Sequence, residues 1–247
     1  RRPLFTPARS SENLRVHRCE SGKALFRDQQ GCPIIAQLAC LTFSQNETIS
    51  MKLSQHRILT THVGSLPRSE EVFKLVFAKE AGEKIDMNHY DQVIADAVQS
   101  VVRKQTDVGV DVVSDGEQSK ISYATYIKHR LNGFDGDSPR RTPKDLEEYP
   151  AFSKRASSSG GVPTYSRPQC VGPISVKDLK PLEVDLQNFK DALSASEATD
   201  AFMNAASPGV IAQFQPNQHY PDHSSYLYAL ADAMKVEYEG IAEAGLV

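Results

Sequence analysis

The sequence lacks the features that define several protein classes. It contains no apolar run approaching the roughly 18 residues that a membrane-spanning helix requires. Its 28 basic residues against 31 acidic ones give a formal net charge of −3, whereas a nucleic-acid-binding protein needs a basic face to displace phosphate counterions. Glycine and proline, at 14 residues each, are close to ordinary usage, which excludes collagen-like and wholly disordered chains. We therefore expect a globular protein of one large domain, with no nucleic-acid or membrane partner.

Cysteine is also scarce. The four cysteines are Cys19, Cys32, Cys40 and Cys170. No two of them form a Cys-x-x-Cys pair, and no histidine follows at zinc-finger spacing, so the sequence assigns no metal ligands among them. This usage is typical of a reducing compartment, and we expect a cytoplasmic location.

The first 50 residues differ in composition from those that follow. Residues 1–27 carry seven basic side chains and only two acidic ones, the chain starts with Arg1, and the first methionine is Met51. An arginine-rich, acid-poor leader is typical of an organellar transit peptide. Because prolines and glycine interrupt any amphipathic helix there, we favour the alternative, an irregular leader over 1–50 outside the folded domain at 51–247.

From residue 51 onward, the pattern alternates strands and helices. Runs rich in β-branched and apolar residues predict strands at 58–63, 110–114, 169–175 and 201–206, with a fifth beginning at 246–247. Apolar residues at helical spacing predict helices at 69–79, 88–107, 123–128, 181–195 and 224–244. This alternation indicates an α/β fold with a parallel sheet. A (β/α)8 TIM barrel is the natural candidate, here as an incomplete barrel of the first four or so βα units.

A long irregular segment interrupts this alternation at residues 132–161. It carries several prolines and glycines and ends in a serine–glycine tract at 157–161. Loops of this length in a compact domain are usually functional or disordered. Because strands and helices resume after it, we interpret the segment as an active-site excursion rather than a linker between domains.

Two predicted strand exits carry the candidate chemistry. His62-Val63-Gly64-Ser65 follows the first strand, where glycine lets a ligand approach the backbone and free N–H groups could hold a carboxylate or phosphate. Asp115-Gly116-Glu117 follows the second strand, and its two carboxylates could hold an amine or transfer protons. The alternatives are an ordinary turn after the first strand, with His62 as a hydrogen-bonded strand residue, and a solvated, helix-capping turn after the second.

Four segments, taken in order, resemble a known family. They are residues 58–68, 111–117, 171–175 and 226–246. They resemble the catalytic domain of cobalamin-independent methionine synthase and its single-domain relatives in the uroporphyrinogen decarboxylase/methionine synthase-like superfamily. The resemblance implies a zinc-dependent TIM-barrel methyltransferase. Its reaction moves a methyl group from 5-methyltetrahydrofolate, as the polyglutamate, to the thiol of homocysteine and makes methionine.

The resemblance also implies roles for individual residues. Val63 and Ser65 would contact the carboxylate of the amino acid through the Gly64 turn, and Glu117 would bind its ammonium. Zinc would bind the thiol as a thiolate, which makes the sulfur nucleophilic at neutral pH. The family's zinc ligands, a His-x-Cys, a Glu and a later Cys, are expected beyond Val247. We accordingly expect a truncated chain in which no residue is assigned to the metal.

Two departures from the larger enzymes leave alternatives open. His62 stands where those enzymes usually have a hydroxyl residue, and Asp115 stands where they usually have a histidine. One alternative is therefore a related alkyltransferase that uses another thiol, as the coenzyme M transferases do. The other is a non-catalytic fragment that acts only by binding.

Overall fold

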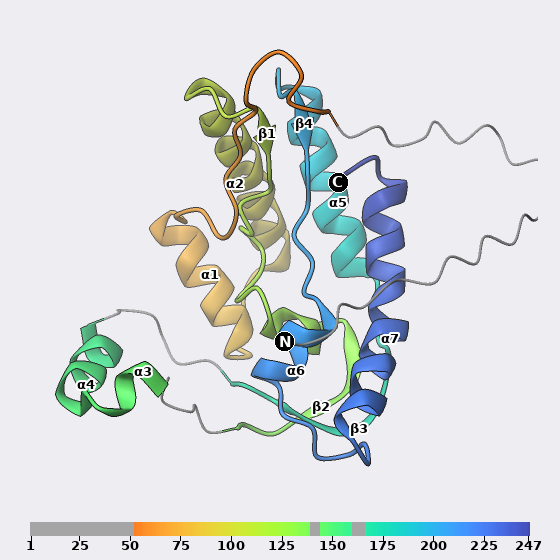
Figure 1. Cartoon of the computed structure of the whole chain (residues 1–247). Helices are drawn as coiled ribbons and strands as arrows, with labels where there is room; N and C mark the ends of the chain where they lie inside the picture. The colour runs from red at the N-terminus through yellow and green to blue at the C-terminus, as the bar shows by residue number, and fades with distance from the viewer. Residues whose placement is uncertain (1–51, 139–143, 160–165) are drawn as a thin grey trace, which may run out of the picture. The chain divides into compact units, whose positions relative to one another are not determined.

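The computed structural model describes residues 52–138, 144–159 and 166–247 (Figure 1). The leader predicted at 1–50 lies outside these ranges. None of the helices in the described ranges has both the length and the apolar character that crossing a membrane requires.

Four of the predicted helices are confirmed. They are α1 (Glu70–Glu80), α2 (Met87–Asp107), α5 (Lys180–Ser194) and α7 (His223–Glu243). Side-chain caps explain where three of them begin, because Ser69, Asp86 and Asp222 each accept hydrogen bonds from N–H groups of the first turn. The buried apolar positions of α2 recur every three or four residues, namely Tyr90, Ile94, Val98, Val101 and Val102. The predicted helix at 123–128 is a 3-10 helix, η1 (Thr125–His129).

A short parallel sheet lies beside α2 and α5, which run next to each other along it (Figure 1). Strand β1 (Val112–Val113) pairs in parallel with β4 (Asp200–Ala201). The first predicted strand, 58–63, joins β1 through a parallel bridge between Thr61 and Val112 and through hydrogen bonds to the Thr60 carbonyl oxygen. Helices that pack beside a parallel sheet make this an α/β fold, as predicted.

The chain end lies along the other side of β4. The Val247 N–H donates to the Ala201 oxygen at 3.1 Å, and the Met203 N–H donates to the Val247 oxygen at 3.3 Å. This alternation is the pattern of a parallel ladder, which agrees with the prediction that 246–247 begin a strand. The sheet therefore runs in the order of the sequence, from 60–61 through β1 and β4 to Val247.

The prediction that residues 169–175 form a strand of the parallel sheet is wrong. These residues form a strand, β3 (Gln169–Val176), but it pairs antiparallel with β2 (Leu131–Asp135) in a separate two-stranded sheet. The segment predicted as irregular at 132–161 contains, in its described parts, most of β2 as well as α3 (Lys144–Glu147) and α4 (Pro150–Ser159). The sequence pattern does not predict β2, because Gly133 interrupts the run of residues that is typical of a strand.

The strand predicted at 201–206 is shorter in the structure. Only Asp200–Ala201 is strand, and residues 202–207 are irregular, although the Phe202 and Met203 N–H groups still donate to the neighbouring segments of the sheet. A short helix that the sequence analysis missed, α6 (Pro208–Phe214), follows it. The Ser207 side chain accepts a hydrogen bond from the Val210 N–H at this helix's start, with proline in its first turn.

Gly133 lies in β2 against the backbone of β3. Its φ is +93°, and a Cβ atom added there would be 2.7 Å from the Pro173 carbonyl oxygen and 2.8 Å from that of Gly172. Both are backbone atoms, which cannot rotate away. We expect Gly133→Ala to lower the free energy of unfolding by about 2–3 kcal/mol, measured by urea denaturation.

Gly136 offers a matched control for this substitution. It also has a positive φ, +72°, but the nearest atom to an added Cβ would be 3.9 Å away. Gly136→Ala should therefore cost only about 1 kcal/mol, the penalty of the backbone conformation alone. Equal losses for the two variants would contradict the steric argument.

Candidate functional site

The two predicted strand exits meet in the structure. The Leu66 N–H donates to the Gly116 carbonyl oxygen at 3.0 Å, and the Ser65 hydroxyl donates to Glu117 Oε2 at 2.6 Å. Gly64 makes the turn with φ +97°. Among the described residues other than glycine, Glu117 is the one with a positive φ, 55°. Such backbone strain is concentrated at functional sites, because the surroundings must hold it in place.

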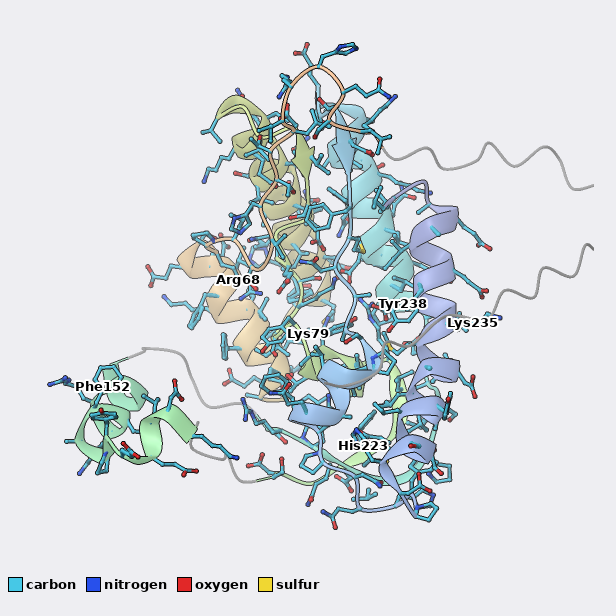
Figure 2. The ribbon with its side chains drawn as sticks, in the orientation of Figure 1. Arg68, Lys79, Phe152, His223, Lys235 and Tyr238 are labelled. Carbon is cyan, nitrogen blue, oxygen red and sulfur yellow. The ribbon has the colours of Figure 1, made fainter. Side chains whose placement is uncertain are left out.

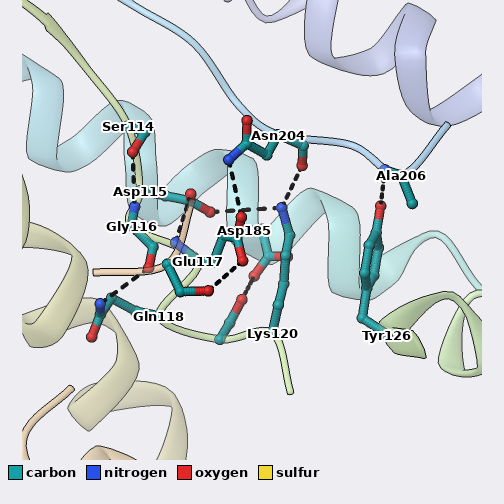
Figure 3. A network of polar contacts seen from close by, with 12 residues as sticks. Ser114, Asp115, Gly116, Glu117, Gln118, Lys120, Tyr126, Asp185, Asn204 and Ala206 are labelled. Atoms are coloured by element: carbon teal, nitrogen blue, oxygen red, sulfur yellow. Dashed lines mark hydrogen bonds and ion pairs between the residues drawn. The ribbon is translucent and has the colours of Figure 1, made fainter. Parts of the chain in front are cut away.

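Glu117 presents a buried carboxylate at this junction. The residue is 2% exposed, and its second oxygen accepts a hydrogen bond from Asn204 Nδ2 at 3.0 Å (Figure 3). Both donors to the carboxylate, the Ser65 hydroxyl and the Asn204 amide, are neutral. A buried carboxylate held only by neutral donors favours a cation beside it.

A cavity of about 330 Å³ opens next to this carboxylate. Its lining includes Val63, Gly64 and Glu117 from the first two exits and Asn204 from the segment after β4. Val63 is 72% exposed. Two of the predicted site residues, Val63 and Glu117, thus line one space, and Ser65 contacts Glu117 from outside the lining.

Arg68 binds the backbone of the loop that carries Glu117. Its guanidinium, just before α1 (Figure 2), donates to the carbonyl oxygens of Glu117 at 2.6 Å and Gln118 at 3.1 Å. Burial lowers the pKa of Arg68, although the charge of Glu117 opposes this change. Arg68 therefore supports the backbone of the loop and leaves the carboxylate to neutral donors.

Asp115 contacts other residues of its own loop. Its Oδ1 accepts a hydrogen bond from the Glu117 N–H at 3.0 Å, and its Oδ2 lies 3.9 Å from Lys120 Nζ. The residue is 2% exposed. The geometry gives Asp115 a part in fixing the strained backbone of Glu117, and it does not line the cavity beside Glu117.

His62 lies on the opposite side of its segment from Val63. Its side chain lines a different cavity, of about 610 Å³, whose other walls come largely from α2. In the described part of the chain its Nε2 is buried without a hydrogen-bond partner. Side chains alternate between the two faces of an extended segment, so the structure does not bring His62 together with Glu117.

Two contributors to the site were missed by the sequence analysis. Asn204 holds the Glu117 carboxylate, and Lys120 donates to the Asn204 carbonyl oxygen at 2.7 Å. The sequence places Asn204 inside the predicted strand 201–206, and only the early end of β4 at Ala201 puts it after a strand, as the other site residues are. Lys120 had no signal in the sequence, because its partner is 84 positions away in the sequence.

An aromatic pair has one of its two members, Tyr123, in the lining of the cavity. Tyr123 lines the cavity, is 51% exposed, and meets Phe214 edge to face with 5.4 Å between ring centroids. The guanidinium carbon of Arg167 lies 5.3 Å from the Phe214 ring centroid. Such a pair can stack on a flat ring of a ligand.

A second polar network, centred on Arg130, is buried. Arg130 pairs with the carboxylates of Asp185 and Glu237, and all three residues are less than 10% exposed. Burial raises the pKa of the Asp185 carboxyl, against the pull of Arg130. Tyr126 donates to Glu237 and accepts from the Ala206 N–H at 3.1 Å, which ties the network to the segment that carries Asn204.

Across residues 52–138, 144–159 and 166–247, no three histidine, cysteine or acidic side chains gather as a metal would require. The described residues therefore do not fit the zinc that the family resemblance implies. No chemical step is assigned to a metal on this part of the chain.

Comparison with known proteins confirms the family resemblance predicted from the sequence. A sequence model of the family described as "Cobalamin-independent synthase, Catalytic domain" matches residues 58–139. The methionine synthase of Saccharolobus solfataricus is 26% identical over 186 residues, which are 75% of this chain and 49% of that protein. The methionine synthase of Sulfurisphaera tokodaii is 27% identical over the same length, 75% of this chain and 48% of that protein.

A solved structure has a similar fold. The B12-independent methionine synthase from Shewanella sp. W3-18-1, in complex with selenomethionine, superposes with a TM-score of 0.54 at 22% sequence identity. The match covers 76% of this chain and 49% of that one. The chain thus spans about half the length of the relatives that it matches.

Proposed function

We propose, from this chain's similarity to the catalytic domain of cobalamin-independent methionine synthases, that it forms part of a (β/α)8 barrel that transfers a methyl group from a methylated folate to homocysteine. The observation that carries the proposal is the buried Glu117 carboxylate beside the Gly64 turn. An α-amino acid needs an anionic partner for its ammonium and N–H donors for its carboxylate, and this junction offers both.

Each end of the amino acid has a partner at the site. Glu117 would bind the ammonium, since its carboxylate is buried and has only neutral donors. The N–H groups of Gly64 and Ser65 would hold the carboxylate. In the described part of the chain, only the next N–H, that of Leu66, has a backbone acceptor in this turn, the Gly116 oxygen. The side chain of homocysteine would then extend into the cavity of about 330 Å³.

The methyl donor would lie against the aromatic pair. Tyr123 and Phe214 offer ring surfaces of the kind on which a flat pteridine ring stacks. Zinc, as implied by the resemblance, would supply an activated thiolate when bound, but the described residues provide no ligands for it.

The partners that we propose are small molecules, and the proposed location is the cytoplasm, in agreement with the free thiol of Cys170.

Isothermal titration calorimetry of the full chain tests the amino-acid site. The ligands are L-methionine, 4-(methylthio)butanoate, which lacks the ammonium, and 3-(methylthio)propylamine, which lacks the carboxylate. We expect L-methionine to bind at least about tenfold more tightly than either analogue, because each analogue leaves one partner without its ligand group, either the Glu117 carboxylate or the backbone N–H groups.

The analogues also separate the alternatives. Equal binding of methionine and 4-(methylthio)butanoate would overturn the role of Glu117 and favour a thiol acceptor without an amino group. No binding of any of the three ligands would overturn the proposed amino-acid site.

A further inference from the structure

Lys120 is a fully buried cation that the proposed chemistry does not use. The residue is 4% exposed, its Nζ lies 2.7 Å from the Asn204 carbonyl oxygen and 3.9 Å from Asp115 Oδ2, and it faces the Tyr126 ring at 5.3 Å (Figure 3). The side chain lines the cavity beside Glu117. Burying an ammonium is costly, so its position calls for a physical reason.

The contacts of Lys120 close a ring around Glu117. The Glu117 N–H donates to Asp115, Asp115 faces Lys120, Lys120 donates to the Asn204 oxygen, and the Asn204 amide donates back to Glu117 Oε1. The ring joins the loop after β1 to the segment after β4 (Figure 3). It therefore fixes both the backbone and the carboxylate of Glu117.

A buried ion pair contributes less to stability than apolar packing of the same volume, but it can specify one geometry. Here the geometry matters, because a carboxylate must be held within a fraction of an ångström to recognise an ammonium selectively. Asn204 lies on an irregular segment whose backbone is held on either side, because the Met203 N–H donates to the Val247 oxygen and the Ala206 N–H donates to the Tyr126 hydroxyl. Lys120 adds a hydrogen bond to the carbonyl oxygen of Asn204 itself.

We propose that Lys120 is a positioning residue for the ammonium site: by anchoring Asn204 and facing Asp115, it sets the orientation of the Glu117 carboxylate and so the preference for α-amino acids. The ligand preference rests on the proposed function. The anchoring of Asn204 can be measured without any ligand.

Calorimetry on the full-length Lys120→Met variant tests the proposal. We expect the affinity for L-methionine to fall about tenfold or more, while the affinity for 4-(methylthio)butanoate changes less than about twofold. The preference for the ammonium-bearing ligand is thus lost. A merely structural role would weaken both ligands alike, and that result, or unchanged preference, would overturn the proposal.

Lys128→Met is the matched control. Lys128 is also largely buried and pairs with a carboxylate, that of Glu80, but it does not line the cavity beside Glu117. This variant should keep the preference for methionine. If Lys120→Met fails to fold because Asp115 is left unpaired, the double variant Lys120→Met with Asp115→Asn removes that charge, and the same loss of preference is expected.

A ligand-free measurement separates this proposal from the proposed function. The side-chain amide signals of Asn204 in a ¹⁵N-correlated NMR spectrum are assigned by their absence in Asn204→Ala. We expect Lys120→Met to shift these signals toward those of a solvent-exposed amide, and Lys128→Met to leave them in place. If the wild type shows no preference for methionine, the proposed function is overturned, while the anchoring of Asn204 is still measured by its signals. Asn204 signals that do not shift in Lys120→Met would overturn the positioning role.

Discussion

Replacing Arg130 with methionine should lower the free energy of unfolding by about 3–5 kcal/mol. The guanidinium neutralises two carboxylates, Asp185 and Glu237, which are 9% and 4% exposed. Without the guanidinium, both carboxylates remain buried without this cation. Leaving them so costs more free energy than the ion pairs contributed to stability. Since domains are stable by only about 5–15 kcal/mol, the variant should lose a large share of its total stability.

Urea denaturation followed by circular dichroism measures this loss. Arg103→Met is the control, since Arg103 pairs with Asp107 at 3.7 Å on an exposed helix face and should cost less than about 0.5 kcal/mol. A triple variant, Arg130→Met with Asp185→Asn and Glu237→Gln, should recover most of the stability. The two amides are uncharged, and their oxygens still accept from Ser119 and Tyr126. A loss below about 1 kcal/mol for Arg130→Met would show that the network is not critical.

The second large effect is expected from Glu117→Gln. The substitution keeps the size of the side chain but removes the charge that we propose for the ammonium of the substrate. A buried, charge-assisted hydrogen bond of this kind accounts for about 2–4 kcal/mol, so the affinity for L-methionine should fall about 30- to 1000-fold. The amide also offers only one acceptor to the two donors, Ser65 and Asn204, that now serve the carboxylate.

Binding of L-methionine by calorimetry checks this prediction, with Glu80→Gln as the control. Glu80 is also largely buried and paired, but its partners are Lys128 and His129, outside the cavity beside Glu117. The control variant should bind methionine like the wild type, even if it is less stable. The two variants together separate loss of charge at the site from loss of a buried carboxylate elsewhere. Methionine affinity within about threefold of wild type in Glu117→Gln would rule out the ammonium role.

The sequence by itself determined four of the helices and the place of the candidate site along the chain. Helices α1, α2, α5 and α7 follow from the local spacing of apolar residues, and in α1, α2 and α7 also from capping side chains, which act within a few residues. The turn at Gly64 and the carboxylate of Glu117 are predictable for the same reason. Each follows a run of strand-forming residues, and parallel strands end at one edge of a sheet.

The tertiary structure decided what depends on pairing between distant segments. The partner of β3 is β2 and not β1 or β4, although the sequence marks β3 as a strand, because the choice of partner is not encoded locally. The register of the first predicted strand, 58–63, places Val63 at the cavity beside Glu117 and His62 at a different cavity. Asn204 reaches Glu117 across 87 positions of sequence, and only the folded sheet brings their strand exits together.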